Sequence, residues 1–341
     1  MKVSFCITSY NQAGLIKRNL ESVFALELPC DFEVLIGDDG STDGTAEELE
    51  KFRKRYPDKI KIYFMPREAG KAYNIRKRVG ANRLNIIEKA SGDYIVSADG
   101  DDFFCRKTFV SEALEILEKD KSLVGCAFNF KISYSDGREE TVSQNIKSGV
   151  LDTDWFVCKR KYIHVGGIVF RNILDSGKVS FLKQYGYFED VITTFYMLQF
   201  GKLYYINEPA YVYYKWEGGV WNGSTVCNQT VVNAWLYGLA KCIIPKLSLQ
   251  ILKRHFNEIK YVYKNRNNLE NLLGSERLKN HIRNAMDVQD CFLAGLLDWR
   301  RSGLNDKIKI VCAYYRLKLK RVLIFRRLNN NNEKNPLGRV V

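Results

Sequence analysis

The first hundred residues alternate between short apolar runs and longer amphipathic stretches. The apolar runs are rich in β-branched and aromatic residues, which is typical of strands, and they lie at 2–8, 32–41, 59–65 and 93–98. Between them, apolar side chains recur near helical spacing at 12–26, 42–56 and 74–90. This alternation of strands and helices predicts an α/β domain with a mostly parallel central sheet.

Acidic residues follow two of these predicted strands. Asp38 and Asp39 come at the end of the second run, and the sequence Asp-Gly-Asp-Asp at 99–102 follows the fourth. Ligands of such sheets bind at the carboxyl ends of the strands, so both acidic groups are expected on one rim. Carboxylates this close repel one another, and a bound cation would relieve that repulsion. The alternative is a solvated acidic turn.

The regular alternation ends after residue 105. We expect a helix at 107–120, a hairpin with its turn at Asp136-Gly137, a short strand at 164–171 and a helix opened by Glu189 and Asp190. From about residue 236 the pattern is mainly helical. The predicted division is therefore a domain at 1–235, whose pattern changes at about residue 105, followed by a basic helical region at 236–341.

Composition and charge narrow the class of protein. The 341 residues are 46% hydrophobic and 27% charged, as in a folded protein, and the nine cysteines form no paired motif. With no signal peptide and no apolar run of roughly 18 residues, the sequence predicts a cytoplasmic protein. Residues 241–341 carry 22 Lys and Arg against 8 Asp and Glu, whereas residues 1–240 carry 31 of each sign. The second part is therefore expected to favour anionic surfaces.

Several short motifs occur in an order that resembles a known enzyme family. They are "SFCITSYNQ", "VLIGDDGSTDGT", "ASGDYIVSADGDD", "GGIVFR", "YFEDV" and "INEPAYVYYKW" followed by "GST". Together, over roughly residues 1–226, they resemble the family 2 glycosyltransferases. The resemblance implies a GT-A fold, in which a nucleotide-binding, donor-binding part at about 1–104 precedes an acceptor-binding part at about 105–235. It also implies transfer of a sugar from a nucleotide donor.

The chemistry of that transfer favours a divalent cation at the Asp-Gly-Asp-Asp motif. The departing nucleoside diphosphate gains negative charge, which Mg²⁺ or Mn²⁺ held by carboxylate oxygens can stabilise. Asp101 is the first expected ligand and Asp99 the second, while Asp102 is expected beside them. By the resemblance, the donor-binding residues are Thr8, Tyr10, Asp39, Arg83, Asp99 and Gly100, and the pattern of Tyr10 and Asp39 favours a UDP-sugar.

Two of these assignments have plain structural alternatives. The family's Ala-Arg-Asn element reads Asn82-Arg83-Leu84 here, so Arg83 can equally be an exposed helix residue. Asp39 can equally form an Asx turn within "DDGS".

The Glu-Asp element at 189–190 matches the family's catalytic acid pair. A carboxylate in reach of the acceptor hydroxyl can take its proton, so Asp190 is the expected base and Glu189 its neighbour. One base and one displacement would invert the anomeric configuration. The alternative is that both acids only favour the start of a helix.

Other residues carry weaker signals. His164 shows no metal-ligand spacing and reads as structural or surface. Gly166-Gly167 can allow close approach to donor or acceptor or simply disturb a strand, and Trp216 with Trp221 can form a sugar-stacking lid or pack in the core.

The sequence thus predicts a metal-dependent, inverting glycosyltransferase acting on a glycan or lipid-linked acceptor in surface polysaccharide synthesis. The rivals are a non-catalytic nucleotide-sugar-binding or scaffold protein and, with a poorer motif match, a nucleotidyltransferase. Between Asp306 and Glu333 basic and apolar residues alternate, and no acidic residue occurs. This pattern predicts that the C-terminal segment docks on the inner face of a membrane. Salt-dependent binding to anionic vesicles would test the prediction. The alternative is an amphipathic helix packed on the catalytic domain, and no nucleic-acid motif is present.

Overall fold

The computed structural model describes most of the first 219 residues and a few positions beyond them. The described residues are 1–68, 70–71, 73, 75–158, 162–186, 188–219, 233, 236–237, 240, 243–247, 250–251, 254 and 319. Contacts divide the chain into one unit of residues 1–156 and 160–223 and a second of residues 157–159 and 224–341. The boundaries expected from the sequence stay predictions, and the basic segment 306–333 lies outside the described residues, apart from Leu319.

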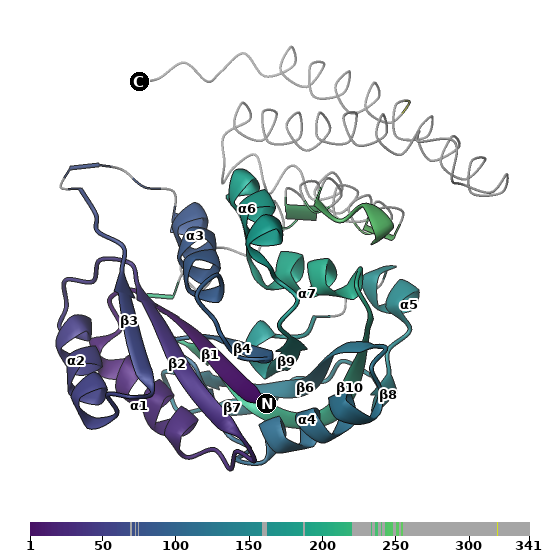
Figure 1. The fold of residues 1–341 in the computed structure, drawn as a ribbon, viewed down its shortest axis with the longest axis horizontal. Helices are drawn as coiled ribbons and strands as arrows, with labels where there is room; N and C mark the ends of the chain where they lie inside the picture. Colours follow the sequence, from purple (N-terminus) through teal and green to yellow (C-terminus); the bar gives the residue numbers. More distant parts are fainter. Residues whose placement is uncertain are drawn as a thin grey trace, which may run out of the picture. The chain divides into compact units, whose positions relative to one another are not determined.

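The first unit begins with the predicted strand–helix alternation (Figure 1). Its elements are β1 (Lys2–Ser9), α1 (Ala13–Phe24), β2 (Asp31–Asp38), α2 (Thr45–Arg55), β3 (Ile60–Phe64), α3 (Ile75–Ile87) and β4 (Tyr94–Asp99). The four strands are parallel and stand in the order β3-β2-β1-β4. The sequence therefore predicted this half element by element.

The sheet continues through strands of mixed direction. These elements are β5 (Phe103–Phe104), α4 (Phe109–Lys119), β6 (Leu123–Tyr134), β7 (Glu139–Thr141), β8 (Gly149–Val150), α5 (Thr153–Cys158), the 3₁₀ helix η1 (Val165–Gly167), β9 (Ile168–Arg171), α6 (Ser176–Tyr185), α7 (Asp190–Leu198) and β10 (Lys202–Lys215). The strand order runs on as β4-β9-β6-β10-β5. The long strands β6 and β10 are parallel, while β9 is antiparallel to both of its neighbours.

The second half of the sheet agrees only in part with the elements predicted from the sequence. The hairpin is confirmed, because β6 and β7 pair antiparallel and Gly137 has a φ of +86° in the turn. The expected strand at 164–171 is partly wrong, since its first residues form η1 and only Ile168–Arg171 is a strand. The helix α6 has no counterpart in the prediction.

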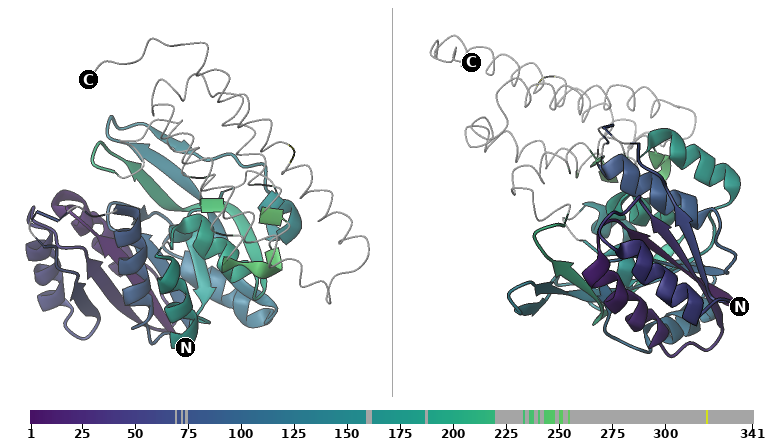
Figure 2. Two further views of the ribbon diagram at one scale, coloured as in Figure 1. Left: turned by 90° about the horizontal axis from the view of Figure 1, so that it is seen from above. Right: turned by 90° about the vertical axis from the view of Figure 1, so that its left-hand side faces the viewer.

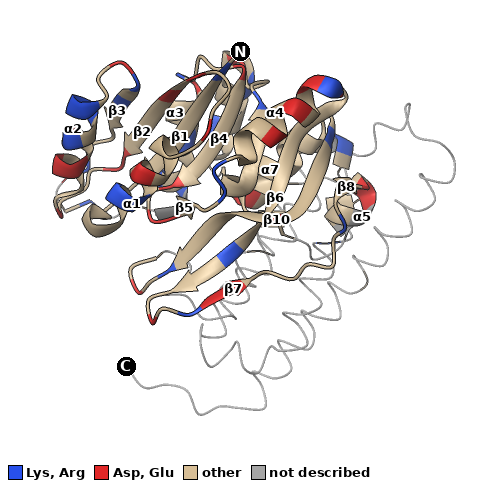
Figure 3. Cartoon of the chain, turned by 90° about the horizontal axis from the view of Figure 1, so that it is seen from below, with Lys and Arg blue, Asp and Glu red and all other residues tan. Residues whose placement is uncertain are grey.

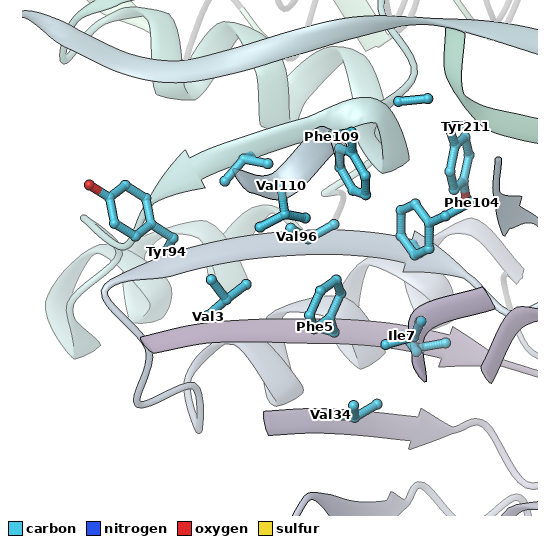
Figure 4. Close-up of a cluster of buried hydrophobic side chains, with 14 of the residues drawn as sticks. Val3, Phe5, Ile7, Val34, Tyr94, Val96, Phe104, Phe109, Val110 and Tyr211 are labelled. Carbon is cyan, nitrogen blue, oxygen red and sulfur yellow. The ribbon is translucent and has the colours of Figure 1, made fainter. Parts of the chain in front are cut away.

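Helices cover both faces of the sheet. The helices α1, α2 and α4 lie on one face, and α3, α6 and α7 lie on the other (Figures 1 and 2). A buried apolar cluster joins α1, α2 and α4 to the sheet, and every second residue of β1, namely Val3, Phe5 and Ile7, belongs to it (Figure 4). Successive side chains of a strand point to opposite faces of the sheet, so these three residues face the same layer of helices.

In the second unit, the described residues show helical spacing of buried apolar side chains. They include Leu236, Ala240, Ile243, Ile244, Leu247 and Ile251. A 3₁₀ turn, η2 (Pro245–Leu247), lies within this stretch. No helix among the described positions of either unit is long and apolar enough to cross a bilayer.

Charged residues lie mainly on helices and at strand ends (Figure 3). Glu33 differs from them because it lies within β2 and its side chain is buried, with 2% of the residue exposed. Its carboxylate accepts hydrogen bonds from the Ser4 hydroxyl, from both the amide and the hydroxyl of Ser91, each at 2.8 Å, and from Lys2 Nζ at 3.1 Å. Burial raises the pKa of Glu33, but these hydrogen bonds outweigh it and lower the pKa to about 2. Glu33 therefore joins β1 and β2 to the segment before β4.

We predict that Glu33→Gln lowers the free energy of unfolding by about 1–3 kcal/mol at neutral pH. The folded-state pKa lies below the unfolded value of about 4.3, so the stabilisation is present above that value and is lost as pH falls toward 2. Denaturant unfolding at several pH values should show the gap between wild type and variant narrowing below pH 5. Glu21→Gln, on the exposed side of α1, is the control and should change little; a gap that does not depend on pH would contradict the prediction.

Candidate active site

The parallel pairing of β1, β2 and β4 brings the acidic groups to one edge of the sheet. Thr8 is the register partner of Asp99, and Ser9 is the partner of Asp38. The amide of Gly100 then donates to the carbonyl of Thr8 at 2.8 Å, and the amide of Asp39 donates to the carbonyl of Ser9 at 2.9 Å. Both acidic groups therefore lie on the rim on which the sequence placed them.

Asp38 and Asp39 have different surroundings. Asp38 is buried and accepts hydrogen bonds from the amides of Gly40 and Ser41 and from the hydroxyl of Ser9. The Asx turn considered for Asp39 is thus made by its neighbour. The carboxylate of Asp39 instead forms ion pairs with Arg67 and Arg78.

An exposed aromatic residue lies beside Asp39. Tyr10 is 38% exposed, and the guanidinium of Arg67 lies over its ring, 3.8 Å from the centroid. Arg78 lies 4.7 Å from the ring of Tyr73 in the same way. Sequence reasoning missed Arg67 and Arg78, which belong to no motif. The basic composition of residues 67–78 was the one available signal.

Arg83 lies inside the domain rather than on the surface of α3. The residue is 1% exposed, which rules out the exposed-helix alternative. Its Nη2 donates to Asp99 Oδ1 at 2.9 Å, and its Nη1 donates to Asp190 Oδ1 at 3.2 Å and to the carbonyl of Phe188 at 3.1 Å. One guanidinium thus connects the end of β4 with the start of α7.

Asp99 is held from two sides. The hydroxyl of Thr8 donates to Oδ1 at 2.7 Å, and Arg83 donates to the same oxygen. Burial raises the pKa of Asp99, but the charge of Arg83 and the bond from Thr8 outweigh burial, so its pKa lies below the usual range. Asp99 is therefore a carboxylate that stays ionised.

Asp101 receives less compensation from its neighbours. The indole N–H of Trp216 donates to Asp101 Oδ2 at 2.8 Å, and Arg18 donates to the backbone carbonyl at 3.1 Å. Burial and the negative charge of Asp99 raise the pKa of Asp101 to about 6. The other member of the predicted tryptophan pair, Trp221, lies outside the described residues.

Glycine at position 100 gives room to neighbouring side chains. A Cβ there would lie 2.6 Å from Gln12 Oε1 and 2.7 Å from Ile16 Cδ1. Gly100 therefore lets the acidic turn approach α1 closely, and its predicted contact with the donor stays a prediction.

Asp102 anchors the turn to β10. It is buried, and it accepts hydrogen bonds from the Tyr211 hydroxyl and the Tyr214 amide, each at 2.8 Å. Burial, with the charges of Asp101 and Asp99, raises the pKa of Asp102 well above its usual range. A Cβ on Gly166 would lie 2.1 Å from Tyr211 Cζ, so this glycine gives room to the Tyr211 ring.

Asp190 is the first residue of α7 and points into the same network. Its Oδ2 accepts the Tyr162 hydroxyl at 2.5 Å, and its Oδ1 accepts Arg83. Glu189 occupies the N-cap position, where its carbonyl accepts the Thr193 amide at 2.8 Å. Asp190 therefore does more than favour the start of the helix.

His164 belongs to this network, although the sequence suggested a structural or surface residue. It is 3% exposed, and its Nε2 lies 3.7 Å from Asp102 Oδ2 and 3.7 Å from Asp190 Oδ2. Burial lowers the pKa of His164 below its ordinary value. No spacing in the sequence reveals this contact, because it joins three separate segments.

Comparison with known proteins identifies the family of this chain. The model of glycosyl transferase family 2 matches residues 4–175, about half of the chain. The chain belongs to glycosyl transferase family 2.

Curated relatives of this family 2 glycosyltransferase are distant. An uncharacterised protein of Mycobacterium tuberculosis is 22% identical over 256 residues, which cover 72% of this chain and 68% of the relative. An uncharacterised glycosyltransferase of Nostoc sp. is 29% identical over 150 residues, covering 44% of this chain and 42% of that protein.

Solved structures confirm the GT-A fold of the glycosyltransferase. The crystal structure of S. aureus TarS 1–349 with UDP has a TM-score of 0.60 and 17% identity, covering 100% of this chain and 94% of that one. The same TarS fragment with UDP-GlcNAc has a TM-score of 0.57 and 18% identity, covering 88% and 92%. At this identity the likeness shows the fold.

The acidic turn of this glycosyltransferase fits a hard divalent cation. The bonds from Thr8 and Arg83 use one oxygen of Asp99 and the bond from Trp216 uses one of Asp101, so each carboxylate has a second oxygen for another ligand. Burial and the charge of Asp99 raise the pKa of Asp101, and a bound cation would stabilise its ionised form. Among the described residues no cluster of three metal-binding side chains occurs. Mg²⁺ or Mn²⁺, which combines one or two carboxylates with phosphates and water, suits such a pair.

Proposed function

We propose that this glycosyltransferase uses Mg²⁺ or Mn²⁺ and a UDP-sugar, and transfers the sugar with inversion to a glycan or lipid-linked acceptor in surface polysaccharide synthesis. Asp99 and Asp101 are the proposed metal ligands, and Asp190 is the proposed base. Glu189 is proposed to help orient the acceptor.

One observation carries the proposal: the bridge that Arg83 makes between Asp99 and Asp190. Both carboxylates lie within 3.2 Å of the same guanidinium. A residue from the motif expected to bind the donor therefore lies next to the residue expected to activate the acceptor. A transferase needs both groups at one reaction centre, since the attacking oxygen must come within about 3–3.5 Å of the sugar carbon.

The nucleoside is assigned to the cluster around Tyr10 and Asp39. The ring of Tyr10 can cover the face of a base, and a carboxylate such as Asp39 can accept the imide N–H of uracil. Arg67 and Arg78 keep Asp39 paired and add positive charge close to the diphosphate. The complexes of TarS with UDP and UDP-GlcNAc support a uridine nucleotide.

The metal, when bound, supplies positive charge that stabilises the departing diphosphate. Asp99 and Asp101 would hold it, and the hydrogen bonds from Arg83 and Thr8 fix the orientation of Asp99. Trp216, bonded to Asp101, is the described tryptophan of the proposed sugar-covering pair.

Asp190 takes the proton of the acceptor hydroxyl as its oxygen attacks the anomeric carbon. The bond between that carbon and the diphosphate oxygen breaks, and the nucleoside diphosphate leaves with the electron pair. Arg83 and Tyr162 each occupy one lone pair on a different oxygen of Asp190, so lone pairs remain to accept the proton. A single displacement of this kind inverts the configuration.

The proposed location is the cytoplasm, with attachment to the inner membrane face through the basic C-terminal segment. That part of the proposal rests on the sequence alone. The main rival to catalysis is a protein that binds nucleotide-sugars without turnover. The close bonding of Asp99, Arg83 and Asp190 favours catalysis over that rival.

We predict that wild-type protein releases nucleotide from one member of a donor panel only when Mg²⁺ or Mn²⁺ is present. Asp101→Asn should lose this metal-dependent release, because one ligand is removed without opening a core. Asp58→Asn, at an exposed turn before β3, is the matched control and should retain wild-type activity. Near-normal release by Asp101→Asn across several metal concentrations would contradict the assignment.

We also predict that Asp190→Asn binds the donor but transfers sugar about 10²–10⁴-fold more slowly, the usual contribution of a positioned base. Calorimetry of UDP binding with metal should give similar affinities for wild type and variant. Loss of UDP binding together with transfer would remove Asp190 from the role of base. NMR of the product should show the opposite anomeric configuration to the donor.

A further inference from the structure

His164 has a fixed ring orientation. Its ring centroid lies 4.8 Å from that of Tyr211 and 5.2 Å from that of Tyr213, with Phe130 5.6 Å away. Aromatic packing on several sides holds the imidazole in place at the start of η1. The surroundings of its two nitrogens are therefore defined.

The hydrogen bond to Nδ1 determines which nitrogen of the neutral ring carries hydrogen. The amide of Gly166 donates to Nδ1 at 3.3 Å, so that nitrogen is an acceptor and the hydrogen is on Nε2. Nε2 lies 3.7 Å from both Asp102 Oδ2 and Asp190 Oδ2. The N–H is thus between two carboxylates, just beyond hydrogen-bonding distance of each.

The two carboxylate oxygens near His164 are also held by tyrosines. The Tyr211 hydroxyl donates to Asp102 Oδ2 at 2.8 Å, and the Tyr162 hydroxyl donates to Asp190 Oδ2 at 2.5 Å. His164 therefore completes a ring of contacts through Asp99, Arg83, Asp190, His164, Asp102 and Tyr211, which the amide of Asp99 closes by donating to the Tyr211 hydroxyl at 3.4 Å.

We propose that His164 is a positioning residue that sets the orientation of Asp190 relative to the Asp99–Asp102 turn. The proposal rests on the function proposed above, in which Asp190 takes the acceptor proton. Arg83 and Tyr162 hold Oδ1 and Oδ2 of Asp190 by hydrogen bonds, and the Nε2–H of the packed His164 ring lies 3.7 Å from Oδ2, where its dipole and bulk limit rotation of the carboxylate. A misplacement of about 1 Å of such a group can cost about 10²-fold in rate.

Two substitutions separate positioning from packing. His164→Asn keeps an acceptor near the place of Nδ1 and removes the donor at Nε2. His164→Gln places an amide N–H near Nε2 and gives up the acceptor for Gly166. Each variant thus retains one half of the polar role of the ring.

We expect His164→Asn to lower kcat about 10- to 100-fold, the range typical of groups that orient a functional residue, with the donor KM changed less than about twofold. His164→Gln should recover most of kcat. In an Asp190→Asn background, His164→Asn should leave the residual rate unchanged, because the residue that it orients no longer acts as base.

Other outcomes overturn the proposal. The first is a wild-type kcat for His164→Asn. The second is an equal loss of kcat in both variants that parallels their loss of thermal stability. The third is a further loss of kcat of about 10- to 100-fold when His164→Asn is added to Asp190→Asn. If the wild-type protein transfers no sugar from any donor, the proposed function itself fails. If the wild type is active and the variants behave otherwise than expected, the role of His164 alone fails.

Discussion

The site depends on a buried cation, the guanidinium of Arg83. A charge that is 1% exposed must be offset by its neighbours, and the two Nη groups of Arg83 donate to two carboxylates and a carbonyl. Because Asp99 ends β4 and Asp190 begins α7, their shared partner fixes the distance between two separate parts of the fold. Removing either acid would leave the guanidinium undercompensated, so stability and proposed catalysis depend on the same contact.

The carboxylates of the site differ in how firmly the protein satisfies them. Asp99 has an ion pair and a hydroxyl, and Asp102 has a hydroxyl and an amide, each within hydrogen-bonding distance. Asp101 accepts the neutral indole of Trp216, and its pKa is raised to about 6. The pKa of Asp102 is raised as well, so the ionised forms of both carboxylates lack a counter-charge, and a cation bound at Asp101 would supply one to the turn.

The sequence predicted the first half of the fold and the common edge of its acidic groups, for a physical reason. Local periodicity of apolar residues indicates where strands and helices alternate. Because the carboxyl ends of parallel strands meet at one edge of the sheet, Thr8, Asp39 and Asp99 could be placed on that edge. Burial of Arg83 was not predictable, because α3 also carries Lys77 and Arg78 and its apolar pattern does not show which cation faces inward. His164, Tyr162 and Tyr211 reach the site only through the mixed second half of the sheet, where pairing joins β6, β9 and β10 across long sequence separations. Such contacts leave no local signal.

Replacing Arg83 with lysine, and measuring sugar transfer and thermal unfolding together, tests most directly whether the Arg83 bridge organises the site. A lysine keeps the positive charge but lacks the planar fork that reaches Asp99 and Asp190 at once. If the bridge organises the site, Arg83→Lys should remain folded and lose transfer by at least about 10²-fold, as expected when a reacting group is displaced. Wild-type transfer by a folded Arg83→Lys protein would contradict the account.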